Sequence, residues 1–133
     1  MTHRFGLTVY YEDTDMAGVV YYANYLRFIE RARSEIVAEM GVDQNALRVA
    51  GIVFVVTRVE ADYLGAARFG DRLEVITAHW AQSPVRWVFD QTVVRDGETL
   101  FRARVTAVAM TTAGRPARLP AEIRACLGTK TGM

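Results

Sequence analysis

Residues 24–41 read NYLRFIERARSEIVAEMG, a stretch with a clear helical period. Its apolar side chains recur every three or four residues and would form one stripe on a helix: Tyr25, Phe28, Ile29, Ala32, Ile36 and Met40. Asn24 is a good N-cap residue, because its side-chain oxygen can accept an orphan backbone N–H. Gly41 suits the position after the helix, where a left-handed conformation costs glycine little. The pattern predicts a helix from Asn24 to Met40, with Glu30 and Arg33 able to pair weakly on its polar side.

Alternating apolar and polar residues on both sides of this helix predict five strands. The expected strands are residues 5–11 before the helix and residues 52–64, 72–80, 85–94 and 100–110 after it. Asp96 and Gly97 give a hairpin signal between the last two strands. A short helix at 120–127 closes the chain. This order predicts an α+β fold, in which one long helix lies across a five-stranded antiparallel sheet.

One helix can cover only one face of such a sheet. The other face is also partly apolar, and a homo-oligomer would cover it economically. The chain of 133 residues has the size of one domain, so we expect a single domain over 1–133. Residues 128–133 are expected to form a frayed tail.

The composition excludes several classes of function. The 16 basic and 15 acidic side chains leave a net charge of +1, which argues against a dedicated nucleic-acid binder. Two histidines and one cysteine, Cys126, are too few for a closed zinc site of the common types or for an internal disulfide. Apolar runs are far shorter than a bilayer span, and the first residues lack the apolar run of a secretory signal. We therefore expect a cytoplasmic protein without a metal or redox cofactor.

Residues 10–25 read YYEDTDMAGVVYYANY and hold the densest group of candidate functional residues. Glu12, Asp13 and Asp15 lie just before the start of the predicted helix. Unsatisfied backbone N–H groups at a helix start can polarise a carbonyl oxygen and stabilise an oxyanion. A nearby carboxylate could act as a nucleophile or as a general base. Ordinary loop acids would show the same spacing, so the spacing alone leaves both interpretations open.

Several motifs of the chain resemble a known protein family. The stretches that carry the resemblance are residues 10–15 (YYEDTD), 17–26 (AGVVYYANYL), 30–33 (ERAR) and 70–75 (GDRLEV). Together they resemble the hotdog-fold acyl-CoA thioesterases, in the branch of the 4-hydroxybenzoyl-CoA and Tol-Pal-associated thioesterases. The resemblance implies a hotdog fold, in which an antiparallel sheet wraps one long helix. It also implies a homodimer, often paired into a homotetramer, with active sites at the dimer interface.

The resemblance assigns two catalytic groups. The family's catalytic carboxylate falls on Asp15, and the backbone N–H that binds the thioester oxygen falls on Tyr22. Asp15 would act either as a nucleophile or as the base that activates water. Many Tol-Pal-associated members carry a histidine at the position of Tyr22, and a tyrosine cannot carry protons in its place near neutral pH, because its ordinary pKa is about 10. The roles assigned to the Asp15 carboxylate and to the Tyr22 backbone N–H need no imidazole, so the tyrosine at this position is compatible with both.

Tyrosines and arginines supply the candidate substrate contacts. Tyr11 and Tyr21 could line an acyl or aryl pocket, or could pack in the core or at a dimer interface. Tyr25 favours the core, because it lies on the apolar stripe of the helix. By resemblance, Arg58 and Arg68 lie near the segment that approaches the pantetheine arm and the nucleotide of coenzyme A. Taken singly, each arginine is more often a solvated surface residue than a ligand contact.

These features lead to one expected function and two rivals. We expect an acyl-CoA thioesterase that hydrolyses a small acyl- or aryl-CoA to free acid and CoA, where coenzyme A is part of the substrate and not a cofactor. A loose association with acyl carrier protein or the lipid-synthesis machinery is a further expectation. The first rival is a non-catalytic protein that binds acyl-CoA or acyl carrier protein, and Asp15 argues against it. The second is a hotdog hydratase or dehydratase, which usually needs an Asp–His pair, and no histidine stands near Asp15 in the sequence.

Overall fold

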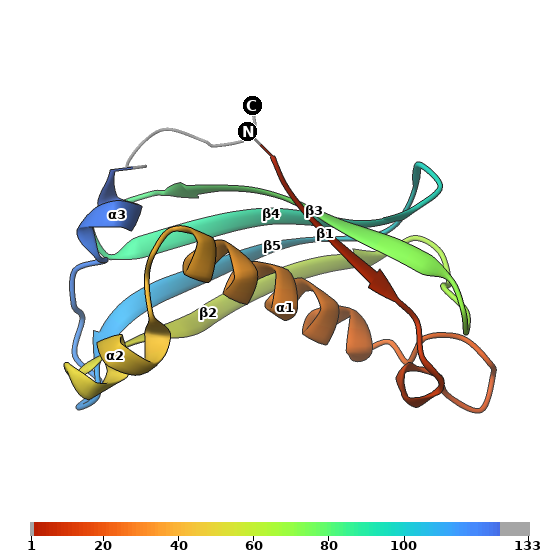
Figure 1. The fold of residues 1–133 in the computed structure, drawn as a ribbon, viewed down its shortest axis with the longest axis horizontal. Helices are drawn as coiled ribbons and strands as arrows, with labels where there is room; N and C mark the ends of the chain where they lie inside the picture. The colour runs from red at the N-terminus through yellow and green to blue at the C-terminus, as the bar shows by residue number, and fades with distance from the viewer. Residues whose placement is uncertain (1, 126–133) are drawn as a thin grey trace.

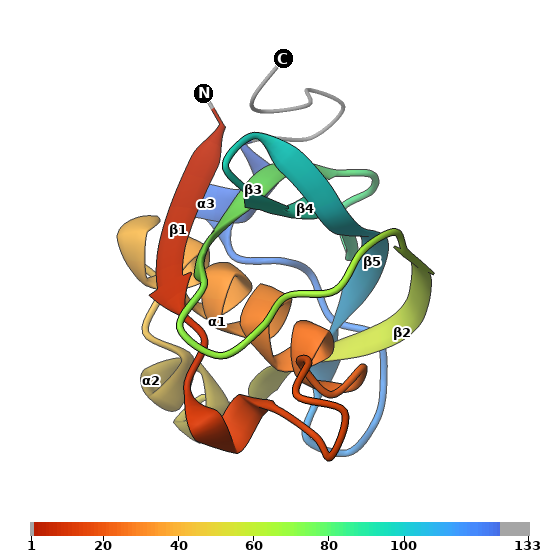
Figure 2. The ribbon, with the colours of Figure 1, turned by 90° about the vertical axis from the view of Figure 1, so that its right-hand side faces the viewer.

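A computed structural model describes residues 2–125, in which a curved antiparallel sheet wraps one long helix (Figures 1 and 2). The strands are β1 (His3–Thr8), β2 (Ile52–Tyr63), β3 (Arg72–Ala81), β4 (Arg86–Arg95) and β5 (Glu98–Thr111). Their order across the sheet is β1-β3-β4-β5-β2, and all neighbours are antiparallel. The long helix is α1 (Asn24–Glu39), and the short ones are η1 (Tyr11–Asp13), α2 (Gln44–Val49) and α3 (Ala121–Arg124). The predicted α+β fold with its five-stranded antiparallel sheet is confirmed.

Two elements differ from the sequence-based expectation. The first strand ends at Thr8 instead of residue 11, because the chain turns into η1 at Tyr11 and the Tyr10 N–H donates to the Asp13 carboxylate instead of to a neighbouring strand. Helix α2 was not predicted; the Asp43 side chain accepts the backbone N–H groups of Asn45 and Ala46 and so caps its start. The expected frayed tail lies outside the described residues. No helix of the described part is long and apolar enough to cross a membrane.

The core lies between α1 and the concave face of the sheet. Helix α1 buries the predicted stripe, with Phe28 and Ile29 at 0% and 1% exposure. Alternate residues of β3, β4 and β5 face this stripe, and Val75, Phe89 and Val105 are at most 2% exposed. Full burial of one such side chain stabilises the fold by about 1.5–3 kcal/mol. This packing holds the helix, and with it the loop before the helix, against the sheet.

A polar network crosses this apolar contact. Gln91 on β4 is 1% exposed, and its Nε2 donates to the Ile29 carbonyl oxygen and to the Thr77 hydroxyl, both at 3.0 Å. Arg33 Nη1 in turn donates to Gln91 Oε1 at 3.0 Å. Both ends of the Gln91 amide are therefore satisfied, which a buried amide requires.

His79 on β3 is a structural residue of the same core. It is 8% exposed, and its Nδ1 accepts the indole N–H of Trp87 at 3.1 Å. Burial, together with the smaller effects of the charges of His3 and the N-terminus, lowers the pKa of His79 to about 4. The imidazole is therefore neutral near pH 7 and serves as a hydrogen-bond acceptor.

Strand β2 forms an exposed edge of the sheet. It spans 12 residues, pairs with β5 on one side only and has no buried residue. Val55, Val56 and Val59 are 36%, 45% and 43% exposed. A long edge strand with apolar side chains presents unpaired backbone groups and readily pairs with another strand. The outer face beside it carries ion pairs, among them Asp62 with Arg102 at 3.2 Å.

Candidate functional site

The candidate site is built on the loop between β1 and α1. In this loop the chain folds back, so that Thr14 pairs with Val20 and the Asp15 N–H donates to the Val19 carbonyl at 2.9 Å. Gly18 makes the turn with a φ of +79° and donates its N–H to the Asp15 carbonyl at 3.0 Å. Glycine adopts this conformation without steric cost. The tight return presents Asp15 at the loop surface.

The structure separates the acids of this loop by burial. Asp13 is 3% exposed; its Oδ1 accepts the Asn24 side-chain amide and its Oδ2 accepts the Tyr10 backbone N–H, both at 2.8 Å. Asp15 is exposed, and its Oδ1 accepts the Ala17 N–H at 2.9 Å. Within the described residues, no donor binds its second oxygen. Asp13 therefore has a structural role. Glu12 and Asp15 are both exposed, and the family resemblance assigns the chemistry to Asp15.

The start of α1 differs from the prediction. Ala23 takes the N-cap position without a side-chain bond, while Asn24 is the first helical residue and binds Asp13. The prediction of Asn24 as the N-cap is wrong, because a buried carboxylate binds its side chain instead. The Asn24 N–H donates to the Tyr21 carbonyl at 2.8 Å, but the Tyr22 N–H has no acceptor among the described residues. An unengaged N–H at a helix start can bind a ligand oxygen.

Replacing Asp13 by alanine is expected to lower the free energy of unfolding by about 3 kcal/mol. The change leaves the buried Asn24 amide and the partly buried Tyr10 N–H without an acceptor. Urea denaturation followed by circular dichroism measures the loss. The exposed neighbour Glu12 is the matched control, and Glu12→Ala should change stability by less than about 0.5 kcal/mol. Equal losses in the two variants would contradict the structural role of Asp13.

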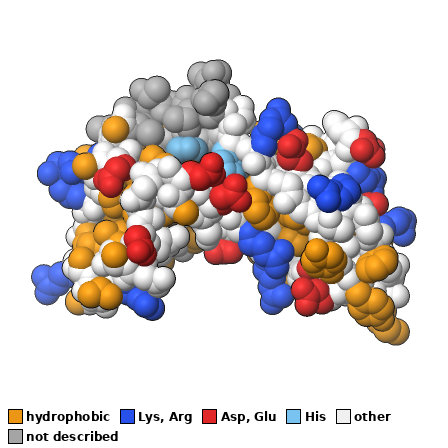
Figure 3. All heavy atoms as spheres, in the orientation of Figure 1, with side chains coloured by type: hydrophobic (Ala, Val, Ile, Leu, Met, Phe, Trp, Pro, Cys, Tyr) orange, Lys and Arg blue, Asp and Glu red, His pale blue; other side chains and the backbone are white. Residues whose placement is uncertain are grey.

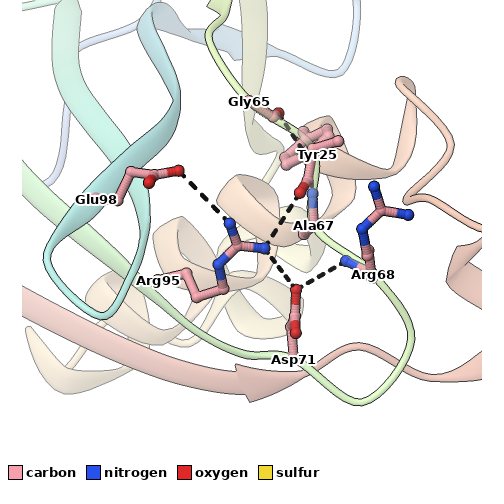
Figure 4. A network of polar contacts seen from close by, with 8 residues as sticks. Tyr25, Gly65, Ala67, Arg68, Asp71, Arg95 and Glu98 are labelled. Carbon is pink, nitrogen blue, oxygen red and sulfur yellow. Dashed lines mark hydrogen bonds and ion pairs between the residues drawn. The ribbon is translucent and has the colours of Figure 1, made fainter.

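A second segment, between β2 and β3, supports the loop from the side. The Val20 N–H donates to the Ala67 carbonyl at 2.8 Å, and Val19 forms a bridge with Arg68. Asp71 holds this segment, since its Oδ2 accepts the Arg68 N–H at 2.9 Å and Arg95 Nη1 at 2.8 Å (Figure 4). The Arg68 N–H and the Arg95 guanidinium keep the pKa of the Asp71 carboxyl below its ordinary value.

Helix α1 and strand β4 fix the same segment. The Tyr25 hydroxyl on α1 accepts the Ala67 N–H at 3.0 Å and lies 3.5 Å from the Gly65 carbonyl oxygen, to which it donates. Arg95 Nη1 also donates to the Ala66 carbonyl at 3.2 Å. The loop before α1, the helix and the end of β4 are therefore held as one unit. Tyr25 is 2% exposed and belongs to the core, as predicted.

Exposed aromatic side chains surround the loop. Figure 3 shows apolar side chains gathered at the end of the molecule where α1 begins. The exposed aromatic residues there are Tyr10, Tyr11, Tyr21, Tyr22, Tyr63 and Phe69. The Tyr63 hydroxyl donates to the Tyr22 carbonyl at 3.0 Å, and the rings of Tyr21 and Tyr22 lie 5.0 Å apart. Such an apolar patch is typical of a ligand or protein contact.

The two arginines proposed as substrate contacts lie in different places. Arg68 is exposed beside the Asp15 loop. Arg58 lies on the outer face of β2 and lines a hollow of about 460 Å³ with Arg86 and Arg104. Within one chain the structure therefore brings Arg68, but not Arg58, to the loop. The sequence did not reveal this basic hollow, because its members come from three different strands.

The candidate site contains no group of metal ligands within the described part of the chain. His3, Glu35 and Glu39 form the single cluster found there whose ligand atoms lie within 4.8 Å of one another. His3 starts β1, and its Nε2 lies 2.6 Å from Glu39 and 3.4 Å from Glu35, toward the far end of α1. The hydrogen bond between His3 and Glu39 accounts for this cluster.

Comparison with known proteins identifies the family of this chain. Residues 9–127 match the model of the thioesterase-like superfamily. The acyl-CoA thioester hydrolase YbgC of Escherichia coli O157:H7 is 40% identical over 98 residues, which are 74% of this chain and 73% of that protein. The acyl-CoA thioesterase YbgC of Haemophilus influenzae is 38% identical over 124 residues, which are 91% of this chain and 90% of that protein.

A solved structure confirms the fold. The 1,4-dihydroxy-2-naphthoyl-CoA thioesterase from Synechocystis superposes with a TM-score of 0.88 over 96% of each chain, at 24% sequence identity. The resemblance seen in the loop and helix motifs therefore extends to the whole sheet. On the family match, the identities and the shared fold, this chain belongs to the thioesterase-like superfamily, the hotdog thioesterases.

Proposed function

We propose that this protein hydrolyses the thioester of a small acyl- or aryl-CoA to the free acid and CoA. The observation that carries the proposal is the pair of unengaged groups at the start of α1, the Asp15 carboxylate oxygen and the Tyr22 N–H. The names of the Escherichia and Haemophilus relatives support the same reaction. Tyr11, Tyr21 and Arg68 would contact the substrate, because all three lie exposed around this loop.

The two groups suit the chemistry of thioester hydrolysis. The thioester oxygen would accept the Tyr22 N–H at the positive end of the helix dipole, which stabilises the negative charge that develops on it. Asp15 would then take a proton from the attacking water, whose oxygen bonds to the carbonyl carbon. The C–S bond breaks, and Asp15 passes the proton to the departing thiolate, which leaves as the free thiol of CoA. Alternatively, Asp15 attacks the carbon itself and water hydrolyses the resulting anhydride. Both courses convert one thioester and one water to one acid and one thiol, without a cofactor.

A substrate panel tests the proposal directly. The purified protein is incubated with acyl-CoAs from acetyl to lauroyl and with benzoyl-CoA, and free thiol is detected with a colorimetric reagent. Saturable thiol release supports the proposal. Saturable binding without thiol release across the panel would instead support the non-catalytic binding protein. Loss of the ultraviolet absorbance of an enoyl-CoA would support a hydratase, although the described histidines, His3 and His79, lie in other parts of the fold.

The working unit in this proposal is a homodimer formed by the exposed β2 edges. Two observations support it: β2 has no buried residue, and its valines extend the apolar surface. Pairing of two dimers into a homotetramer through the outer face is part of the same proposal, since Ile76 and Ala78 line an outer hollow there beside the ion pairs. A cytoplasmic location and a loose association with acyl carrier protein remain predictions from the sequence.

Arg58 is proposed to bind a phosphate of coenzyme A in the outer hollow. Arg58→Gln should raise KM for acyl-CoA about fivefold and leave kcat near its original value, because an exposed charge contact is worth about 1 kcal/mol and serves binding only. Steady-state kinetics measures both constants. Arg102→Gln is the matched control, since Arg102 also lies on the outer face, bound to Asp62, but does not line this hollow. An unchanged KM in Arg58→Gln would remove Arg58 from the site.

A further inference from the structure

A cavity of about 180 Å³ lies between α1 and the sheet, beside the second to fourth turns of the helix. Its apolar lining comes from the helix and from three strands: Val37, Phe54, Val56, Trp87, Phe89 and Ala107. Glu30, Arg33 and Ser34 of α1 supply polar side chains at the same cavity. An apolar cavity of about 150 Å³ can hold a benzene molecule. This cavity is therefore large enough for a small ring or a short chain.

Arg33 is the positive charge of this cavity. Its guanidinium lies 5.9 Å from the centre of the Phe89 ring and donates one N–H to Gln91, which is neutral. Burial lowers the pKa of Arg33, but an arginine side chain stays protonated in proteins. Within residues 2–125, no carboxylate oxygen lies within 4 Å of it. Arg33 is thus a partly buried cation without an ion-pair partner.

Glu30 does not neutralise Arg33 by contact. The weak pairing that the sequence suggested is not formed; Glu30 is exposed and its Oε1 accepts the Ser34 hydroxyl at 2.9 Å. Arg33 carries five N–H donors and uses one of them on Gln91. Partial burial of a charge is costly unless further acceptors bind it. The free donors of Arg33 therefore favour a ligand that brings an acceptor into the cavity.

We propose that this cavity receives the distal end of an acyl group whose thioester is bound at the Asp15 loop of a second copy, because Phe54 and Val56 of its lining lie on the β2 edge that joins two copies in the proposed homodimer. Arg33 then selects acyl groups that end in a carboxylate. The inference rests on the proposed thioesterase function and adds the substrate class. A guanidinium binds a carboxylate through two parallel N–H···O bonds. The aromatic lining would pack against the apolar part of the same group. Glu30 opposes this binding from the rim, where water screens its charge.

The test compares two series of acyl-CoAs of equal length. One runs from succinyl- to suberoyl-CoA and ends in a carboxylate; the other runs from butyryl- to octanoyl-CoA and ends in a methyl group. The preference is the ratio of kcat/KM within each pair. Arg33→Met should lower the preference about 10- to 100-fold at the best chain length, because a hydrogen bond to a charged group is worth about 1.5–3 kcal/mol. Arg33→Lys should give an intermediate preference, since lysine keeps the positive charge but cannot donate two parallel N–H bonds to one carboxylate.

Two further variants make the result specific. Glu30→Gln should raise the preference, because it removes a negative charge that opposes the carboxylate. Arg27→Met is the matched control on the same helix; Arg27 is exposed and does not line the cavity, so the preference should stay unchanged. The preference is a ratio of two kcat/KM values measured on the same variant. A smaller fraction of folded protein lowers both values equally and leaves the ratio unchanged. If Arg33→Met does not fold, Arg33→Lys and Glu30→Gln carry the same test.

The outcomes separate this inference from the proposed function. A preference that Arg33→Met leaves intact, or a wild-type protein that prefers the methyl series at every length, overturns the carboxylate assignment. Hydrolysis of the methyl series still supports the proposed thioesterase in that case. A protein that releases thiol from neither series overturns the carboxylate assignment, and thiol release from benzoyl-CoA then decides whether the proposed thioesterase stands. Binding of adipoyl-CoA over hexanoyl-CoA by the Asp15→Asn variant, lost on adding Arg33→Met, would support the cavity assignment without turnover.

Discussion

Asp15→Asn is expected to lower kcat about 100- to 10,000-fold, the range that a catalytic acid–base group contributes. Asparagine keeps an oxygen for the Ala17 N–H, so the loop should retain its conformation. It can neither accept a proton from water nor form a stable bond to the acyl carbon. Thiol release measures the loss, and an unchanged melting temperature shows that the fold is kept.

Glu12→Gln is the control for this variant. Glu12 is an exposed acid of the same loop, three residues before Asp15, and the same change of charge there should leave kcat within about twofold of the original value. A folded Asp15→Asn protein with full activity would exclude the carboxylate mechanism. Equal losses in Asp15→Asn and Glu12→Gln would instead point to the net charge of the loop.

Val59→Lys is expected to separate the dimer and to remove most of the activity. Val59 lies in the middle of the exposed edge strand β2 and is 43% exposed. A lysine on an edge strand prevents another strand from pairing with it. If the active sites lie between two copies, loss of the dimer should abolish thiol release. Light scattering after size-exclusion chromatography measures the mass, and the thiol assay measures the activity.

Val49→Lys provides the matched control for the edge strand. Val49 is 86% exposed on α2, so the substitution adds the same charge away from β2. Its mass and activity should equal those of the unchanged protein. A dimeric and active Val59→Lys protein would rule out pairing through β2, and a fully active monomer of the original chain would show that one copy suffices.

The long helix and the sheet could be predicted because their apolar residues repeat with the period of the element. Helix α1 and the strands after it agree with the expected positions within a few residues. Helix α2 could not be found in this way, because six residues are too short to show a period. Its single local signal was Asp43, which caps its first turn. The early end of β1 depends on a local contact that the alternating pattern does not reveal, since the Tyr10 N–H binds the Asp13 carboxylate.

The site was only partly predictable, because spacing does not reveal burial. Asp13 and Asp15 are two residues apart and chemically alike, yet one is buried and satisfied while the other is exposed. Asn24 has the side chain of a cap, but the buried Asp13 carboxylate binds it. Arg33 falls beside the polar side of the helix in the sequence pattern. It turns inward because Gln91, 58 residues later in the chain, offers an acceptor.

Gln91 also restricts how α1 can slide along the sheet. A stripe of similar apolar side chains would tolerate a shift by one helical turn at little cost. The Ile29 carbonyl and the Arg33 guanidinium meet the two ends of the Gln91 amide in one alignment only. A shifted helix would leave these buried groups unsatisfied, at about 1–3 kcal/mol each. Substitutions in the cavity can therefore alter selectivity while the start of the helix, with its free N–H, keeps its place.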